Sequence, residues 1–192
     1  MIKAIIFDFG GVITTRGYLL WMKEEIPNFE SNKLFYDNLS DKYDLGIITH
    51  KEFTEIIAKE SGIGKDVIWK KIFNKIFVNG ELLKIINKLK KNYKIALLTN
   101  FNNKPLNDLL IKYKLEKYFN IKVISSLQKI HKPDIKIYQV ALSLLKIKPE
   151  EAIFIDDSQK YIDGGKKAGI KSFLFTTNQK LINDLKDSGI IY

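Results

Sequence analysis

The chain has 192 residues, of which 45% are hydrophobic and 28% are charged, a composition typical of a globular protein that buries its own core. The absence of cysteine excludes disulfide scaffolds, thiolate catalysis and cysteine–zinc sites. The formal net charge of +10 favours anionic ligands.

Five short apolar runs predict the strands of a parallel sheet. They show no polar alternation, which is typical of strands that helices cover on both faces. Helical patterns alternate with these runs, so the sequence predicts an α/β fold with a doubly wound, Rossmann-like parallel sheet. The predicted strands are 3–7, 94–98, 121–125, 152–155 and 171–175, and the predicted helices are 81–91, 104–113, 134–145, 158–168 and 178–186.

Residues 15–78 interrupt this alternation and predict an insert of four helices with no strand. One helix begins after Thr49, because Thr49 and Glu52 match a capping box, and another is predicted at 66–77. An insert after the first strand is expected to lie over the carboxyl ends of the strands, where open α/β sheets bind their ligands. We therefore expect two domains: an α/β core of residues 1–14 and 79–192, and a helical cap domain of residues 15–78.

Polar side chains follow the predicted strands at the points where ligands of such sheets bind. They come after the first, second and fourth strands, and before the helix that follows the third. We expect them to lie together at one edge of the sheet. In chain order they are Asp8, Thr99 with Asn100, Lys132, and Asp156 with Asp157.

Three carboxylates at one edge repel each other unless cations neutralise them. Lys132 supplies one positive charge, and Mg²⁺, a hard ion that prefers oxygen ligands, is expected to supply the rest. Such a site would hold a phosphoryl group between metal, lysine and hydroxyl, with a carboxylate in line as the nucleophile.

The order of these motifs resembles that of the haloacid dehalogenase-like hydrolases, most of which are phosphatases. Asp8, Thr99 in Leu-Leu-Thr-Asn, Lys132 and the Asp156–Asp157 pair match in sequence, and the helical insert lies where that family carries a small cap. The resemblance covers the whole α/β portion. It implies a Mg²⁺-dependent phosphatase that hydrolyses a small phosphomonoester, a phosphorylated metabolite, through an aspartyl-phosphate intermediate.

The resemblance also implies a role for each catalytic and substrate-binding position. Asp8 would be the nucleophile. Thr99 and the neighbouring Asn100 amide would hold phosphate oxygens. Lys132 would pair with both the nucleophile and the phosphate, which suppresses their mutual repulsion.

The metal ligands implied by the resemblance are the Asp8 carboxylate, the Gly10 carbonyl and Asp157, with Asp156 as a secondary or water-mediated ligand. The chain departs from the family four residues after Asp157, where Tyr161 replaces the usual Asp or Asn. This replacement changes the expected surroundings of the metal, and Asp163 is considered as a substitute.

A second departure concerns proton transfer. Family phosphatases usually carry a second aspartate two residues after the nucleophile, as general acid and base, and this chain has Gly10 there. A missing proton donor costs about 10²–10⁴-fold in the step it serves. This departure favours a good leaving group, a proton carried by the substrate, or another residue from the cap.

Alternative functions remain open at this point. One is a metal-independent 2-haloacid dehalogenase, although that group shows Tyr-Gly-Thr where this chain has Gly10-Gly11-Val12. Another is a catalytically weak phosphate-binding or regulatory module. A nucleic-acid binder ranks last, because the lysine-rich stretch 84–122 reads as a solvated helix face and Arg16 is the chain's only arginine.

The N-terminus and the apolar runs indicate the expected location. Asp8 ends the first apolar run where a signal peptide would still be apolar, and no run approaches the ~20 residues of a membrane span. We therefore expect a cytoplasmic protein with no membrane partner. Arg16 is interpreted either as a surface residue or as a bidentate contact to an anionic substrate. No pattern indicates an oligomeric state.

Overall fold

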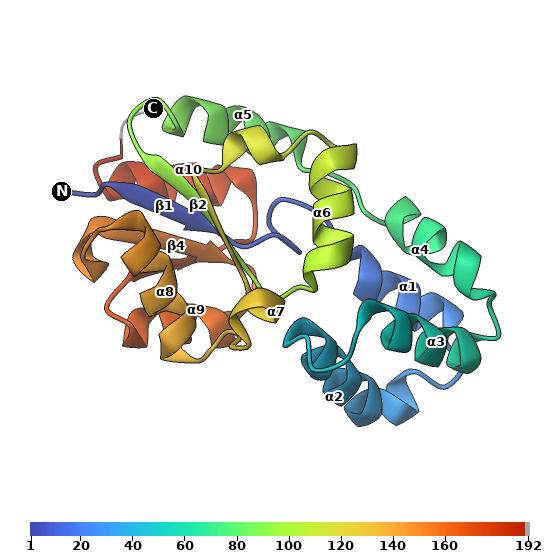
Figure 1. Ribbon diagram of the computed structural model, residues 1–192. Coiled ribbons are helices and arrows are strands. Elements are labelled where there is room, and N and C mark those ends of the chain that lie inside the picture. The colour runs from blue at the N-terminus through green and yellow to red at the C-terminus, as the bar shows by residue number, and fades with distance from the viewer. Residues whose placement is uncertain (191–192) are drawn as a thin grey trace.

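The computed structural model describes residues 1–190, in which five parallel strands form one sheet (Figure 1). The predicted doubly wound sheet is confirmed, and each strand begins and ends within one residue of its predicted bounds. The strands lie in the order β3-β2-β1-β4-β5, so β1 is central, with β2 on one side and β4 on the other. Their bounds are β1 (Ala4–Phe7), β2 (Lys94–Thr99), β3 (Ile121–Ile124), β4 (Ala152–Asp156) and β5 (Lys171–Leu174).

Helices cover both faces of the sheet (Figure 1). On one side lie α8 (Ile135–Leu145) and α9 (Gln159–Lys167), and on the other α5 (Gly80–Leu89), α6 (Asn103–Lys112) and α10 (Asn178–Asp187). In β1, Ala4 and Ile6 belong to the first core, Ile5 and Phe7 to the second, and all four are fully buried. Burial on both faces explains why the strands lack polar alternation.

The chain between β1 and α5 is helical. It forms α1 (Gly17–Glu25), α2 (Lys33–Asp44), α3 (His50–Ser61) and α4 (Lys65–Asn74), and we call residues 17–74 the helical insert. Figure 1 shows the insert beside the end of the sheet at which β1 ends. Its interior is aromatic, since Tyr43 stacks on Phe53 with ring centroids 3.9 Å apart and Trp21 is fully buried. The division of the chain into two domains stays a prediction.

Local signals set the start of α3. The Glu52 N–H donates to Thr49 Oγ1 (3.1 Å), and the Thr49 N–H donates to the Glu52 carboxylate (2.7 Å), so the predicted capping box is confirmed. Gly62 ends the helix with φ +69°, a left-handed conformation that glycine tolerates. None of the helices described in residues 1–190 is long and apolar enough to cross a membrane.

Several element ends differ from the prediction by one to three residues, and the largest difference follows from a contact with the loop after β1. The helix predicted at 66–77 ends at Asn74, because the chain beyond it pairs with the loop after β1, where the Thr15 N–H donates to the Phe77 carbonyl (3.0 Å). The run predicted to end as strand at Ser125 turns there into α7 (Ser125–Gln128). Three short 3₁₀ turns complete the described elements: η1 (Glu30–Asn32), η2 (Glu116–Tyr118) and η3 (Pro149–Glu151).

Candidate active site

The parallel register places Asp8 and Asp156 side by side at the carboxyl edge of the sheet. Phe7 of β1 pairs with Ile155 of β4, and the Asp8 N–H donates to the Ile155 carbonyl oxygen (2.9 Å). Asp8 and Asp156 are the next residues along, so they share a register position on the face covered by α8 and α9. Both are buried, with exposed fractions of 6% and 0%.

The Lys132 ammonium lies between these two carboxylates. Its Nζ is 2.7 Å from Asp8 Oδ1 and 2.6 Å from Asp156 Oδ2, and the lysine side chain is fully buried. Its Nζ also lies 4.8 Å from the centre of the Tyr161 ring, a cation–π contact. Burial disfavours the charged ammonium, but the two carboxylates outweigh burial and raise the pKa of Lys132 above its ordinary value. Lys132 is therefore a permanent cation beside the predicted nucleophile.

Asp156 uses both of its carboxylate oxygens within the protein. Oδ2 binds Lys132, and Oδ1 accepts a hydrogen bond from the Ser158 N–H (2.8 Å). Burial and the charge of Asp8 raise the pKa of Asp156 to about 7, against the opposing effects of Lys132 and the Ser158 N–H. Asp156 is thus a buried carboxyl group whose position is fixed by hydrogen bonds to both of its oxygens.

Asp157 faces a second cation, Arg16, which lies directly before α1. The Nε and Nη2 atoms of Arg16 donate to the two carboxylate oxygens of Asp157 at 2.7 and 2.6 Å, a bidentate pair. The hydrogen bond to Asp157 raises the pKa of Arg16 above its ordinary value. Gly11 makes room for this carboxylate, because its φ is +90° and a Cβ there would lie 1.8 Å from Asp157 Oδ2.

Asp8, Asp156 and Asp157 form a donor set that fits a divalent cation. One carboxylate oxygen from each lies within 4.8 Å of the others. All three donors are oxygens, the ligands that Mg²⁺ prefers in proteins. The predicted Mg²⁺ ligands therefore lie together, and the Gly10 carbonyl stays a predicted further ligand.

The structure gives the two predicted phosphate-binding residues different surroundings. Thr99 is the last residue of β2 and is 1% exposed, and within residues 1–190 its hydroxyl has no hydrogen bond to Asp8 or Lys132. The Asn100 side chain forms two hydrogen bonds with the Lys132 backbone: its Oδ1 accepts from the Lys132 N–H (2.8 Å), and its Nδ2 donates to the Lys132 carbonyl (3.0 Å). Asn100 thus fixes the backbone that carries the lysine.

Residues 2–169 match the haloacid dehalogenase-like hydrolases, and this span contains all the motif residues predicted from the sequence. The chain belongs to this hydrolase family. The predicted resemblance is thereby confirmed.

The relatives of this hydrolase include phosphatases. A phosphorylated carbohydrates phosphatase from Thermotoga maritima is 35% identical over 81 residues, 42% of this chain and 38% of the relative. A glyceraldehyde 3-phosphate phosphatase from Pyrococcus furiosus is 32% identical over 88 residues, 45% of this chain and 36% of the relative. The matches thus span less than two fifths of these relatives' own length. A HAD family enzyme from Bacteroides thetaiotaomicron, solved in complex with magnesium and inorganic phosphate, is 25% identical with a TM-score of 0.79, covering 93% of this chain and 96% of that one.

Tyr161 closes the site where the family usually has Asp or Asn. Its ring faces the Lys132 ammonium, and its hydroxyl accepts a hydrogen bond from Asn100 Nδ2 (3.3 Å). Asp163, considered as a substitute beside the metal, is exposed and accepts a hydrogen bond from Gln159 Nε2 (2.7 Å) on the outer face of α9. That expectation is wrong, because Asp163 lies two residues beyond Tyr161 and faces solvent.

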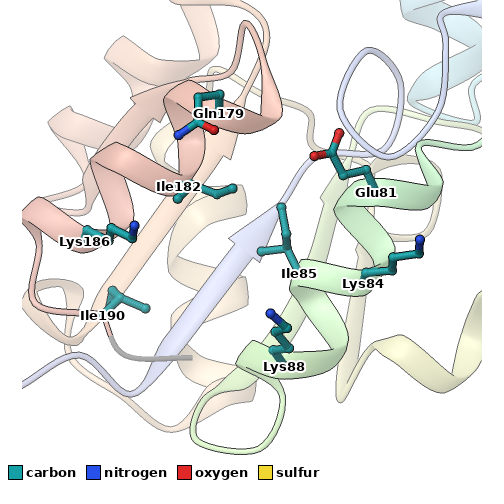
Figure 2. A pocket seen from close by; sticks show the side chains of 8 residues that line it. All are labelled: Glu81, Lys84, Ile85, Lys88, Gln179, Ile182, Lys186 and Ile190. Atoms are coloured by element: carbon teal, nitrogen blue, oxygen red, sulfur yellow. The ribbon is translucent and has the colours of Figure 1, made fainter.

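The cavities that residues 1–190 form at the surface include one between α5 and α10 and one beside α1. The cavity between α5 and α10 has a volume of about 680 Å³, its lining includes Ile85, Ile182 and Ile190, and it contains none of the site residues (Figure 2). The other, of about 550 Å³, is lined by Gly11 and Arg16 together with residues of α1. The second cavity therefore borders the acidic site.

Proposed function

We propose that this hydrolase is a Mg²⁺-dependent phosphatase that cleaves a small phosphomonoester through an aspartyl-phosphate on Asp8. One observation carries the proposal. Asp156 engages both oxygens, with Lys132 and Ser158, whereas within residues 1–190 Asp8 engages Oδ1 alone and keeps Oδ2 free of hydrogen bonds. Of the two buried carboxylates that share the lysine, Asp8 is the one with an oxygen left to attack.

The proposed reaction uses the charges at the edge of the sheet. The Oδ2 atom of Asp8 attacks phosphorus in line with the leaving group. Lys132 keeps a positive charge beside both anions, which lowers the cost of bringing them together. When Mg²⁺ is bound by Asp8, Asp156 and Asp157, it supplies further positive charge to the phosphoryl oxygens. Water then cleaves the acyl phosphate and regenerates Asp8.

Residues and a cavity next to the catalytic groups are proposed to bind the substrate. The Thr99 hydroxyl and the Asn100 main-chain amide are proposed to bind phosphate oxygens, and the helical insert is proposed to act as a cap of residues 15–78. The cavity beside Gly11 and Arg16 suits the remainder of a small substrate. The names of the two curated relatives, which act on phosphorylated carbohydrates and glyceraldehyde 3-phosphate, support a small phosphorylated metabolite. A cytoplasmic location stays a prediction.

The test is phosphate release from p-nitrophenyl phosphate and acetyl phosphate with Mg²⁺. We expect release to stop on addition of EDTA and in the Asp8→Asn variant, which keeps the size of the side chain but cannot form an acyl phosphate. Asp163→Asn, an exposed acid of α9, is the matched control and should keep full activity. Turnover by Asp8→Asn at the wild-type rate would show that the nucleophile is misassigned.

A further inference from the structure

The proposed reaction lacks a proton donor among the motif residues. As the P–O bond breaks, the leaving oxygen takes the electron pair and needs a proton. Lys132 is held by two carboxylates that raise its pKa, Asp156 is bound through both oxygens, and Asp157 is paired with Arg16. Gly10 has no side chain. The donor must therefore come from another element.

Asp44, the last residue of α2, lies where the helical insert meets the carboxyl edge of the sheet. The Ser125 hydroxyl donates to the Asp44 carbonyl (2.5 Å), and the Asn102 side chain donates to the carbonyl of the preceding residue, Tyr43 (3.2 Å). Beyond Asp44, the Lys129 ammonium donates to the Gly46 carbonyl (2.7 Å). Backbone contacts to the loops after β2 and β3 thus fix the position of Asp44 over the sheet edge.

The Asp44 carboxyl group lies within electrostatic range of Asp8 and Lys132. Among residues 1–190 it has no hydrogen bond or ion pair, although it is half-buried. The titratable groups that interact electrostatically with it come from several elements. They are Asp41 on its own helix, Tyr18 of α1, Tyr43 of α2, Asp8 after β1, Lys132 before α8, and Tyr161 of α9.

We propose that Asp44 is the general acid and base of this hydrolase, supplied by the helical insert in place of a residue at position 10. This inference rests on the proposed phosphatase function. Asp8 Oδ2 forms a bond to phosphorus while the P–O bond to the leaving group breaks, and the Asp44 carboxyl group gives its proton to the leaving oxygen. A water molecule then attacks phosphorus and gives a proton to the Asp44 carboxylate, while the bond from phosphorus to Asp8 breaks and returns its electron pair to Asp8.

The electrostatics of Asp44 agree with this role. Burial is the largest influence and, together with the charges of Asp41 and Asp8, raises the pKa of Asp44 to about 8, while Lys132 opposes the rise. The carboxyl group is therefore protonated at neutral pH, as a donor must be. The nearby tyrosines are poorer donors, since burial also raises the pKa values of Tyr18 and Tyr161 above those of ordinary tyrosine.

The test uses a series of aryl phosphates with Mg²⁺, from dinitrophenyl phosphate, whose leaving group needs no proton, to phenyl phosphate, whose leaving group does. With Asp44→Asn we expect kcat to fall about 10²–10³-fold for phenyl phosphate and to stay within about 3-fold for dinitrophenyl phosphate. Wild-type kcat for phenyl phosphate should decline as the pH rises above about 8, because Asp44 loses its proton, and the variant should lack this decline. Asp37→Asn, an exposed acid two turns earlier in α2 that pairs with Lys33, is the matched control and should behave as wild type.

Each other outcome has one meaning. A uniform loss across the series, or no loss with phenyl phosphate, would overturn the role of Asp44 and leave the phosphatase proposal standing. Failure of the wild-type protein to hydrolyse even dinitrophenyl phosphate, or activity that survives Asp8→Asn, would overturn the proposed function itself. Thermal melting of Asp44→Asn confirms that the variant is folded.

Discussion

The site holds two cation–carboxylate groups that differ in burial. The side chain of Lys132 is 0% exposed and those of its partners Asp8 and Asp156 are 9% and 0% exposed, whereas Arg16 is 43% exposed and Asp157 19%. Removing one partner of a buried ion pair leaves a buried charge without compensation. An exposed ion pair contributes little to stability, and its two side chains separate readily. The buried group thus fixes the nucleophile, and the exposed pair can release Asp157 to a metal ion.

The largest effect is expected from breaking the buried group. Lys132→Met leaves Asp8 and Asp156 facing each other without a cation, which should lower the free energy of unfolding by about 3–5 kcal/mol and phosphate release by at least about 10³-fold. Urea denaturation and a phosphate assay measure the two effects. Lys136→Met, an exposed lysine at the start of α8, should change neither. A Lys132→Met variant as stable as wild type would mean that the lysine does not neutralise the carboxylates.

A smaller effect is expected when the support of the lysine is removed. Asn100→Ala deletes both side-chain hydrogen bonds to the Lys132 backbone, so kcat should fall about 10–100-fold through misplacement of the ammonium. Asn107→Ala, in α6, is the control because its side chain donates a hydrogen bond to Asn103 and, within residues 1–190, makes none to the site. Unchanged kcat in Asn100→Ala would show that the loop holds Lys132 without this side chain.

The exposed pair predicts a different response, in metal binding rather than stability. Arg16→Gln frees both oxygens of Asp157 and removes a positive charge beside the proposed metal site, so Mg²⁺ should bind about 3–10-fold more tightly by calorimetric titration. The free energy of unfolding should change by less than about 1 kcal/mol. Lys23→Gln, on the same cavity and paired with Glu30, controls for the loss of charge alone. Weaker Mg²⁺ binding in Arg16→Gln would contradict the proposal that Arg16 competes with the metal for Asp157.

The stability of the helical insert is expected to depend on pH through Asp44. The pKa of Asp44 is raised from the ordinary 3.8 to about 8, so the folded state binds a proton more tightly than the unfolded state. The contribution of Asp44 to stability is therefore fully present below about pH 4 and is lost as the pH rises toward about 8. Asp44→Asn should be more stable than wild type by up to about 4 kcal/mol near neutral pH, and the difference should shrink in acid. Denaturation at several pH values measures this, and a difference independent of pH would contradict it.

The sequence predicted the sheet and the positions of the motif residues because both depend on local patterns. Uniform apolar runs mark strands buried on two faces, and a parallel register then brings Asp8 and Asp156 together without further information. The Thr49 capping box is likewise a signal within four residues. These features need no knowledge of contacts distant in sequence.

The rest depends on such distant contacts. The Arg16–Asp157 pair joins residues 141 positions apart, and the position of Asp44 depends on how α2 packs on Ser125 and Asn102. The sequence offered a weak signal for Arg16, as the only arginine in the chain, and none for Asp44. The hydrogen bonds between the Asn100 side chain and the Lys132 backbone also depend on loop geometry, which the sequence motifs do not predict.

The most direct test of the central claim is chemical trapping of the covalent intermediate on the nucleophile. Protein mixed with radiolabelled acetyl phosphate and Mg²⁺ is quenched in acid, and the label is mapped by peptide mass spectrometry. We predict an acid-stable, hydroxylamine-sensitive label on Asp8 that is absent from Asp8→Asn and from samples that contain EDTA. Label on another residue, or rapid phosphate release with no labelled protein at any quench time, would contradict the account.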